Sequence, residues 1–204
     1  YAFEAATGRK LWTFTAAPAE RRIPVYGKLM STWPVAGGVA VANGVLDPTM
    51  FAANPEMNST AFTLFTADDG RESGMNAGEV DLKVLHGATD APAVDVIARG
   101  VGTLVDDAAY GDMTPYFSVP AASYTLDITP GNDNNTIVAS FAADLSALGG
   151  GAAVVFASGF LAPANNMNGQ AFGLFAALPD GNVVALPAAP APQARLQVIH
   201  NAAD

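Results

Sequence analysis

Val84-Leu85-His86-Gly87-Ala88-Thr89-Asp90 recurs 114 residues later as Val198-Ile199-His200-Asn201-Ala202-Ala203-Asp204. A block that returns at a fixed period predicts a tandem array of similar structural units. The second copy stands at the end of the given sequence, so we expect it to be the first strand of a further unit.

Two more blocks recur at nearly the same spacing. Asn43-Gly44-Val45-Leu46 matches Ser158-Gly159-Phe160-Leu161 at an offset of 115 residues. Ala61-Phe62-Thr63-Leu64-Phe65 matches Ala171-Phe172-Gly173-Leu174-Phe175 at an offset of 110 residues. The predicted unit is therefore about 110–115 residues long, which is a normal size for a β-sandwich.

Short alternating segments between turn residues predict that this unit is built of strands. Residues 80–86 alternate, and residues 124–129 place Tyr124, Leu126 and Ile128 on one face. The continuous apolar run 152–157 indicates a central strand covered on both faces. Further strands are expected at 94–98, 104–110, 116–119, 136–141, 171–177 and 183–186, with one helical turn at 144–148.

The composition limits the classes of partner. The chain has 204 residues, with 20 Gly, 14 Pro and no Cys, and its formal charge is −10. That charge argues against nucleic acid and anionic membranes as partners. The absence of Cys excludes disulfides and thiolate chemistry.

Residues 80–187 resemble the bacterial domain of unknown function numbered 4397, and with the half-copy before them and the strand after them the tandem resemblance covers about residues 41–204. The resemblance is carried by Val84, His86, Asp90-Ala91-Pro92 and Val94-Asp95-Val96, and then by Tyr110-Gly111-Asp112, Val119-Pro120-Ala121 and Tyr124. Ala122 departs from the Gly that is common in the family. The resemblance implies an all-β fold, an immunoglobulin-like or transthyretin-like antiparallel β-sandwich. It also implies an extracytoplasmic domain, often in tandem, without an assigned activity.

The first residues resemble a different family. Ala5-Ala6-Thr7-Gly8, followed by Trp12, is similar to the blade motif of quinoprotein-like β-propellers, and Trp33 begins a second such strand. One blade cannot close a propeller, which needs about four to eight. The sandwich is thus expected to be preceded by a partial sandwich or propeller-like β segment.

These patterns predict five regions. They are a propeller-like segment at 1–45, the second half of a first sandwich repeat at 46–78, a complete repeat at 79–187, an Ala/Pro linker at 188–193 and the first strand of a next repeat at 194–204.

Few side chains suggest chemistry. His86 and His200 occupy the same place in successive repeats, so a structural role at a strand end is favoured over a catalytic pair. A carboxylate cluster offers weak calcium candidates, although the spacing of a calcium-binding loop is missing; its members are Asp90, Asp95, Asp106, Asp107 and Asp112. Tyr110, Tyr116, Phe117 and Tyr124 fit either a sugar-binding platform or the sandwich core.

We therefore expect a non-enzymatic extracellular structural or adhesive module, which needs no cofactor and associates with itself or with neighbouring repeats. The expected inter-subunit strand consists of Arg195, Leu196, Gln197, Val198, Ile199 and His200. It would complete the open half-repeat before Val80 by strand addition. The alternatives are a fragment of a quinoprotein-like redox protein, and a calcium- or glycan-binding surface module.

Overall fold

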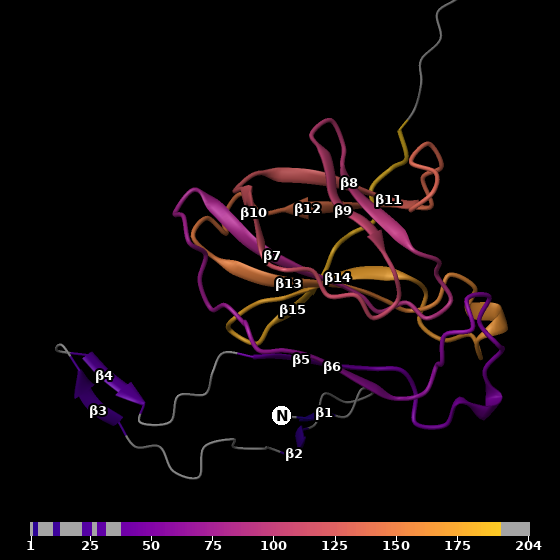
Figure 1. The fold of residues 1–204 in the computed structure, drawn as a ribbon, viewed down its shortest axis with the longest axis horizontal. Coiled ribbons are helices and arrows are strands. Elements are labelled where there is room, and N and C mark those ends of the chain that lie inside the picture. The colour runs from indigo at the N-terminus through magenta and orange to yellow at the C-terminus, as the bar shows by residue number, and fades with distance from the viewer. Residues whose placement is uncertain (1, 4–9, 13–21, 26–27, 32–37, 193–204) are drawn as a thin grey trace, which may run out of the picture. The chain divides into compact units, whose positions relative to one another are not determined.

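The computed structural model describes residues 2–3, 10–12, 22–25, 28–31 and 38–192, and the chain divides into two compact units (Figure 1). The first unit is Tyr1–Val39 with Ala67–Gly70, and the second is Ala40–Thr66 with Arg71–Asp204. The described part of the first unit contains two antiparallel strand pairs. They are β1 (Ala2–Phe3) with β2 (Lys10–Trp12), and β3 (Arg22–Val25) with β4 (Lys28–Ser31). The propeller resemblance remains a prediction.

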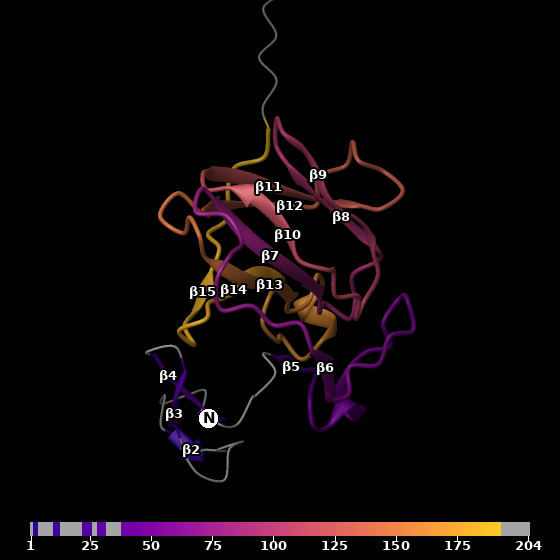
Figure 2. The ribbon, with the colours of Figure 1, turned by 60° about the vertical axis from the view of Figure 1, so that its left-hand side comes forward.

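The second unit contains a β-sandwich of two stacked sheets (Figures 1 and 2). The five-stranded sheet has the order β10-β7-β13-β14-β15, and the four-stranded sheet has the order β12-β11-β8-β9. The strands are β7 (Glu79–His86), β8 (Val94–Ala98), β9 (Gly102–Ala108), β10 (Phe117–Pro120), β11 (Ser123–Pro130), β12 (Ala139–Asp144), β13 (Ala152–Ser158), β14 (Gly173–Ala177) and β15 (Val183–Ala185). The predicted all-β sandwich is confirmed.

One pair of neighbours departs from the antiparallel pattern. β7 and β13 run parallel, with Asp81 opposite Ala152 and His86 opposite Ala157. Parallel neighbours need a long connection, and here the connection contains the whole four-stranded sheet. β13 is the middle strand of its sheet, as the apolar run predicted.

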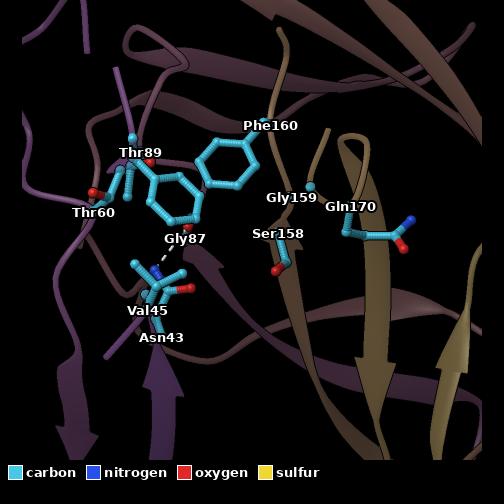
Figure 3. A pocket seen from close by; sticks show the side chains of 12 residues that line it. Asn43, Val45, Thr60, Gly87, Thr89, Ser158, Gly159, Phe160 and Gln170 are labelled. Atoms are coloured by element: carbon cyan, nitrogen blue, oxygen red, sulfur yellow. Dashed lines mark hydrogen bonds between the residues drawn. The ribbon is translucent and has the colours of Figure 1, made fainter. Parts of the chain in front are cut away.

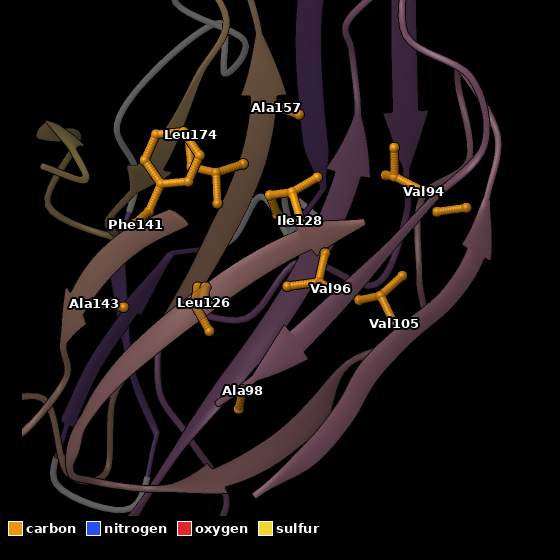
Figure 4. Close-up of a cluster of buried hydrophobic side chains, with 11 residues drawn as sticks. Val94, Val96, Ala98, Val105, Leu126, Ile128, Phe141, Ala143, Ala157 and Leu174 are labelled. Carbon is orange, nitrogen blue, oxygen red and sulfur yellow. The ribbon is translucent and has the colours of Figure 1, made fainter. Parts of the chain in front are cut away.

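The core lies between the sheets in two clusters. The larger cluster joins β8, β9, β11 and β12 to β13 and β14, and includes Ile128, Phe141 and Leu174 (Figure 4). The smaller one joins β7, β10 and β13 through Val80, Leu82, Val119, Ala153 and Val155.

β11 is also covered on its polar face. Leu126 and Ile128 enter the core as predicted, but Asp127 and Thr129 are buried as well, at 4% and 0% exposure. Arg99 closes this face with two bonds to the Asp127 carboxylate, from Nε at 2.8 Å and from Nη2 at 2.6 Å, and the Ser140 hydroxyl donates a third at 2.6 Å. The alternation of 124–129 therefore marks the core side correctly without showing that the other side is buried.

Two local expectations need correction. Asp144 ends β12 and residues 145–148 form a turn instead of a helical turn, because the Asp144 carboxylate accepts bonds from Ser123 and Ser146. The Ala/Pro segment begins as part of the sandwich: Ala188 pairs with Phe141, and Ala189 donates its N–H to the Ser140 carbonyl at 2.8 Å. The chain thus crosses from β15 in one sheet to β12 in the other before residue 190.

Before β7, a strand pair has the same local form as β13 and β14. β5 (Val39–Asn43) and β6 (Thr63–Ala67) form a two-stranded sheet. Gly44 and Gly159 follow the first strand of each pair with φ of +82° and +87°, a backbone region that suits glycine. A Cβ at either glycine would lie 2.3 Å from a carbonyl oxygen, that of Ala61 or of Ala171.

The loops inside the two strand pairs also correspond. Each contains a 3₁₀ turn, Pro48–Met50 in one and Pro163–Asn165 in the other. Met57 and Met167 both adopt a φ of +58°, which is uncommon for residues other than glycine. The two segments matched by sequence therefore have matching backbones.

Candidate functional site

A pocket of about 260 Å³ lies within the second unit, where the loop 44–62 meets the loop 159–172 (Figure 3). The β7–β8 connection passes between these loops and contributes Gly87 and Thr89. The complete lining is Asn43, Gly44, Val45, Phe51, Thr60, Gly87, Thr89, Ser158, Gly159, Phe160, Gly169 and Gln170. The two matched segments thus supply equivalent sides of one pocket.

Short polar contacts hold both loops against the β7–β8 connection. The Asn43 amide donates to the Gly87 carbonyl at 2.8 Å, and the Asn58 amide donates to the Thr89 carbonyl at 3.3 Å. From the other side, the Asp90 carboxylate accepts the N–H groups of Leu161 and Ala162, both at 2.9 Å. These bonds fix the position of each loop without using a charged group inside the pocket.

The lining is neutral and partly aromatic. Phe51 and Phe160 both line it and stack on each other with ring centroids 5.7 Å apart. The polar lining residues include Asn43, whose amide is directed to the Gly87 carbonyl, together with Ser158 and Gln170 (Figure 3). Thr89 Oγ1 is buried and has no partner among the described residues. Aromatic faces with neutral hydrogen-bonding groups suit an uncharged polar ligand.

A second cavity of about 360 Å³ lies between the two sheets of the sandwich. Its walls are mostly Leu and Ala side chains, including Ala143, Ala153 and Ala176. Its two ionisable neighbours are already engaged, since the Tyr124 hydroxyl donates to the Pro120 carbonyl and Asp144 accepts the bonds described above. It lacks free polar groups that would orient a ligand, so the neutral pocket is the better candidate.

His86 has the structural role that its position predicts. It is 2% exposed, and its Nε2 lies 3.0 Å from the Pro92 carbonyl, to which it donates. Nδ1 is then the unprotonated nitrogen, and it is buried with no partner among the described residues. Burial lowers the pKa of His86 below its usual value of 6.5, because the charged ring would lose its hydration. His200 lies outside the described residues.

The five predicted calcium candidates are not brought together. Asp90 anchors a loop, and Asp112 accepts the N–H of Ala109 at 2.9 Å. Asp95 is fully buried and accepts the N–H of Asp107 at 2.7 Å, while Asp106 is exposed. Over the part of the chain that the structure describes, no group of three or more His, Cys, Asp or Glu side chains could hold a metal.

The predicted aromatic platform is also divided. Phe117 and Tyr124 pack against the core clusters. Tyr110 meets Phe65 edge-on at 5.6 Å, and Tyr116 lies under the Arg71 guanidinium at 4.8 Å. These side chains therefore stabilise the sandwich and its neighbouring segment and do not share one surface.

A charged cluster fixes the segment before β7. Asp81 is fully buried and accepts bonds from Arg71 at 2.5 Å, Ser118 at 2.6 Å and the Met75 N–H at 3.2 Å. Burial raises the pKa of Asp81, but these bonds outweigh it and the net direction is downward. The sequence alone does not indicate this cluster, because its members are far apart along the chain and are brought together only by the sheet.

At and beside the β5–β6 sheet, apolar side chains are exposed where their counterparts contribute to the sandwich core. Leu64 is 56% exposed, whereas its counterpart Leu174 is 3% exposed. Phe62 is 54% exposed, whereas Phe172 packs against the core. The predicted inter-subunit strand 195–200 lies outside the described residues.

A protein-family model described as "Domain of unknown function (DUF4397)" matches residues 80–204, and the chain belongs to this family. The resemblance seen in the sequence is thereby confirmed for this region. No curated protein and no solved structure matches the chain. None of the helices in the described residues has the length and apolar character needed to cross a bilayer.

Proposed function

We propose that this DUF4397 member is a non-enzymatic structural or adhesive module of an extracellular tandem-repeat protein, and that copies join by strand complementation. The observation that carries the proposal is the exposed face of the β5–β6 sheet. Its exposed residues correspond to core residues of the sandwich, so over the described part of the chain this sheet presents an apolar face that the sandwich buries at equivalent positions.

The geometry of the strand pair supports this reading. In the sandwich, β13 has β7 on one side and β14 on the other. The corresponding β5 pairs only with β6 among the described residues. A strand with one unpaired edge is a template for another strand, and 195–200 repeats the sequence of the end of β7.

Deletion of residues 194–204 tests the proposal. Assembly of the purified full chain is measured by light scattering during size-exclusion chromatography and by negative-stain electron microscopy. We expect oligomers or fibres for the full chain and monomers for the shortened chain. Multimers that persist after the deletion would refute strand complementation by this segment.

A point substitution tests whether the apolar character of this segment matters, while leaving the chain at full length. Val198→Asp places a charge in the expected strand and should prevent assembly. Val101→Asp is the matched control, because Val101 is 70% exposed in the turn between β8 and β9 and should tolerate the same change. Equal assembly of both variants would argue against the proposal.

The neutral pocket supports a second candidate function, recognition of an uncharged glycan. Phe51 and Phe160 provide aromatic surface, and Ser158 and Thr89 provide neutral hydroxyl groups. A glycan array with the full chain and with Phe160→Ala should show binding that the substitution removes. Absence of a hit with the full chain, or signal unchanged by the substitution, would reject the pocket as a glycan site.

A further inference from the structure

We propose a defined register for this complementation: residues 195–200 of one copy add to β5 of a second copy as a parallel strand, with Val198 opposite Ala40. The inference rests on the proposed function and deepens it by naming the partner segment, its direction and its alignment. It follows from combining two sequence correspondences with one observed strand pairing.

The acceptor strand is identified by its correspondence to β13. Val39-Ala40-Val41-Ala42-Asn43-Gly44 aligns with Val154-Val155-Phe156-Ala157-Ser158-Gly159 at an offset of 115 residues. The turn that follows each strand has a glycine with nearly the same positive φ, and each strand pairs with the strand after its loop. β5 thus corresponds to β13 in sequence, in the glycine that follows it and in its pairing to the next strand.

The donor strand is identified by its correspondence to β7. Arg195-Leu196-Gln197-Val198-Ile199-His200 aligns with Asp81-Leu82-Lys83-Val84-Leu85-His86 at an offset of 114 residues. The apolar positions are kept at Leu196, Val198 and Ile199. The segment therefore has the side-chain alternation of the strand that lies beside β13.

The register is transferred from the observed pair. β7 lies parallel to β13 with Val84 opposite Val155 and His86 opposite Ala157. Applying the two offsets places Val198 opposite Ala40 and His200 opposite Ala42. A shift by one residue would turn the apolar side of the donor away from the apolar side of the acceptor.

The same register completes an apolar row on the exposed face. In the sandwich, Leu82 and Val84 lie on the core side of β7, together with Val155 of β13. Their counterparts Leu196 and Val198 would lie beside Ala40. The added strand would then extend the apolar surface formed by Phe62 and Leu64. It would also pair with the edge of β5 that has no strand partner among the described residues.

Engineered cysteines test the register without interference, because these 204 residues contain no Cys. Two single variants, Val198→Cys and Ala40→Cys, are mixed and oxidised under mild conditions. Linked chains are counted on a non-reducing gel, and the joined peptides are identified by mass spectrometry. A mixed dimer linked through positions 198 and 40 is the expected product, and it can form only between two chains.

The control mixture contains Val198→Cys and Ala42→Cys. Ala42 lies on the same face of β5 as Ala40 but two residues further along the strand, opposite His200 in the proposed register. A two-residue shift exceeds the separation that a disulfide spans, so we expect about tenfold less linkage. Equal or stronger linkage to position 42 would overturn the register.

Assembly is measured by light scattering on the same samples, which separates this inference from the proposed function. If multimers form without linkage between positions 198 and 40, the register is wrong while complementation stands. If the unmodified chain does not multimerise, the proposed function itself fails. If the full-length donor variant folds poorly, a synthetic peptide of residues 194–204 with Val198→Cys replaces it. This peptide is added to the Ala40→Cys chain under the same conditions. Lack of linkage between the peptide and the chain also refutes the register.

Discussion

Replacing Leu174 and its counterpart Leu64 with alanine, one at a time, should produce very different losses of stability. Leu174 is 3% exposed and belongs to the larger core cluster. Removing its buried carbons loses about 0.8 kcal/mol for each methylene equivalent and leaves a cavity, so we expect a loss of about 3–4 kcal/mol. Leu64 is 56% exposed, so water fills the space and the loss should be about 1 kcal/mol.

The assay is urea unfolding of the full chain at low micromolar concentration, followed by circular dichroism. Hydrogen exchange of peptides that contain β14 or β6 assigns each loss to its strand pair. If Leu64→Ala costs as much as Leu174→Ala under dilute conditions, then Leu64 is buried in the isolated chain and the reasoning about an open half-sandwich is refuted.

Three further predictions concern the sandwich. Gly159→Ala should destabilise it more than Gly181→Ala in urea unfolding. Both glycines have φ of +87°, so both substitutions carry a left-handed strain of about 1–2 kcal/mol. Only at Gly159 would the added Cβ also clash with a backbone carbonyl. The pKa of His86 is lower in the fold than the unfolded value of 6.5, so stability should be full above pH 6.5 and fall as pH drops below it; His86→Gln should weaken this dependence in thermal melts at pH 7.5 and 5.5. Asp127→Asn should cost about 2 kcal/mol by leaving the Arg99 guanidinium without its carboxylate, and an unchanged melting temperature would contradict this.

Much of the strand order was accessible from sequence because alternation and turn residues act locally. Residues 94–98 were predicted as a strand, and β8 has the same bounds. The run 152–157 was recognised as a central strand because it lacks polar positions on either face. The parallel pairing of β7 with β13 could not be predicted this way, since it depends on how a long connection folds between them.

The candidate pocket was less accessible because its parts are distant in sequence. Phe51 and Phe160 stack only because two loops, matched in the repeat pattern, meet at the β7–β8 connection. The matching positions of Gly44 and Gly159 were the available signal in the sequence. Two glycines at matching positions indicate similar turns, but they do not show that the two turns enclose a pocket. Asp90 was singled out for its charge, whereas the structure uses it to hold backbone N–H groups of a neighbouring loop.

The crossing of the chain from β15 to β12 determines how mechanical tension would travel through the sandwich. A pull applied beyond residue 190 acts first on the bonds from Ala189 to Ser140 and from Arg99 to the Pro190 carbonyl, which attach the segment to the four-stranded sheet. A pull applied before β7 acts on the five-stranded sheet through Arg71 and Asp81. Opposing forces therefore act on both sheets, and the apolar core between them takes up part of the load.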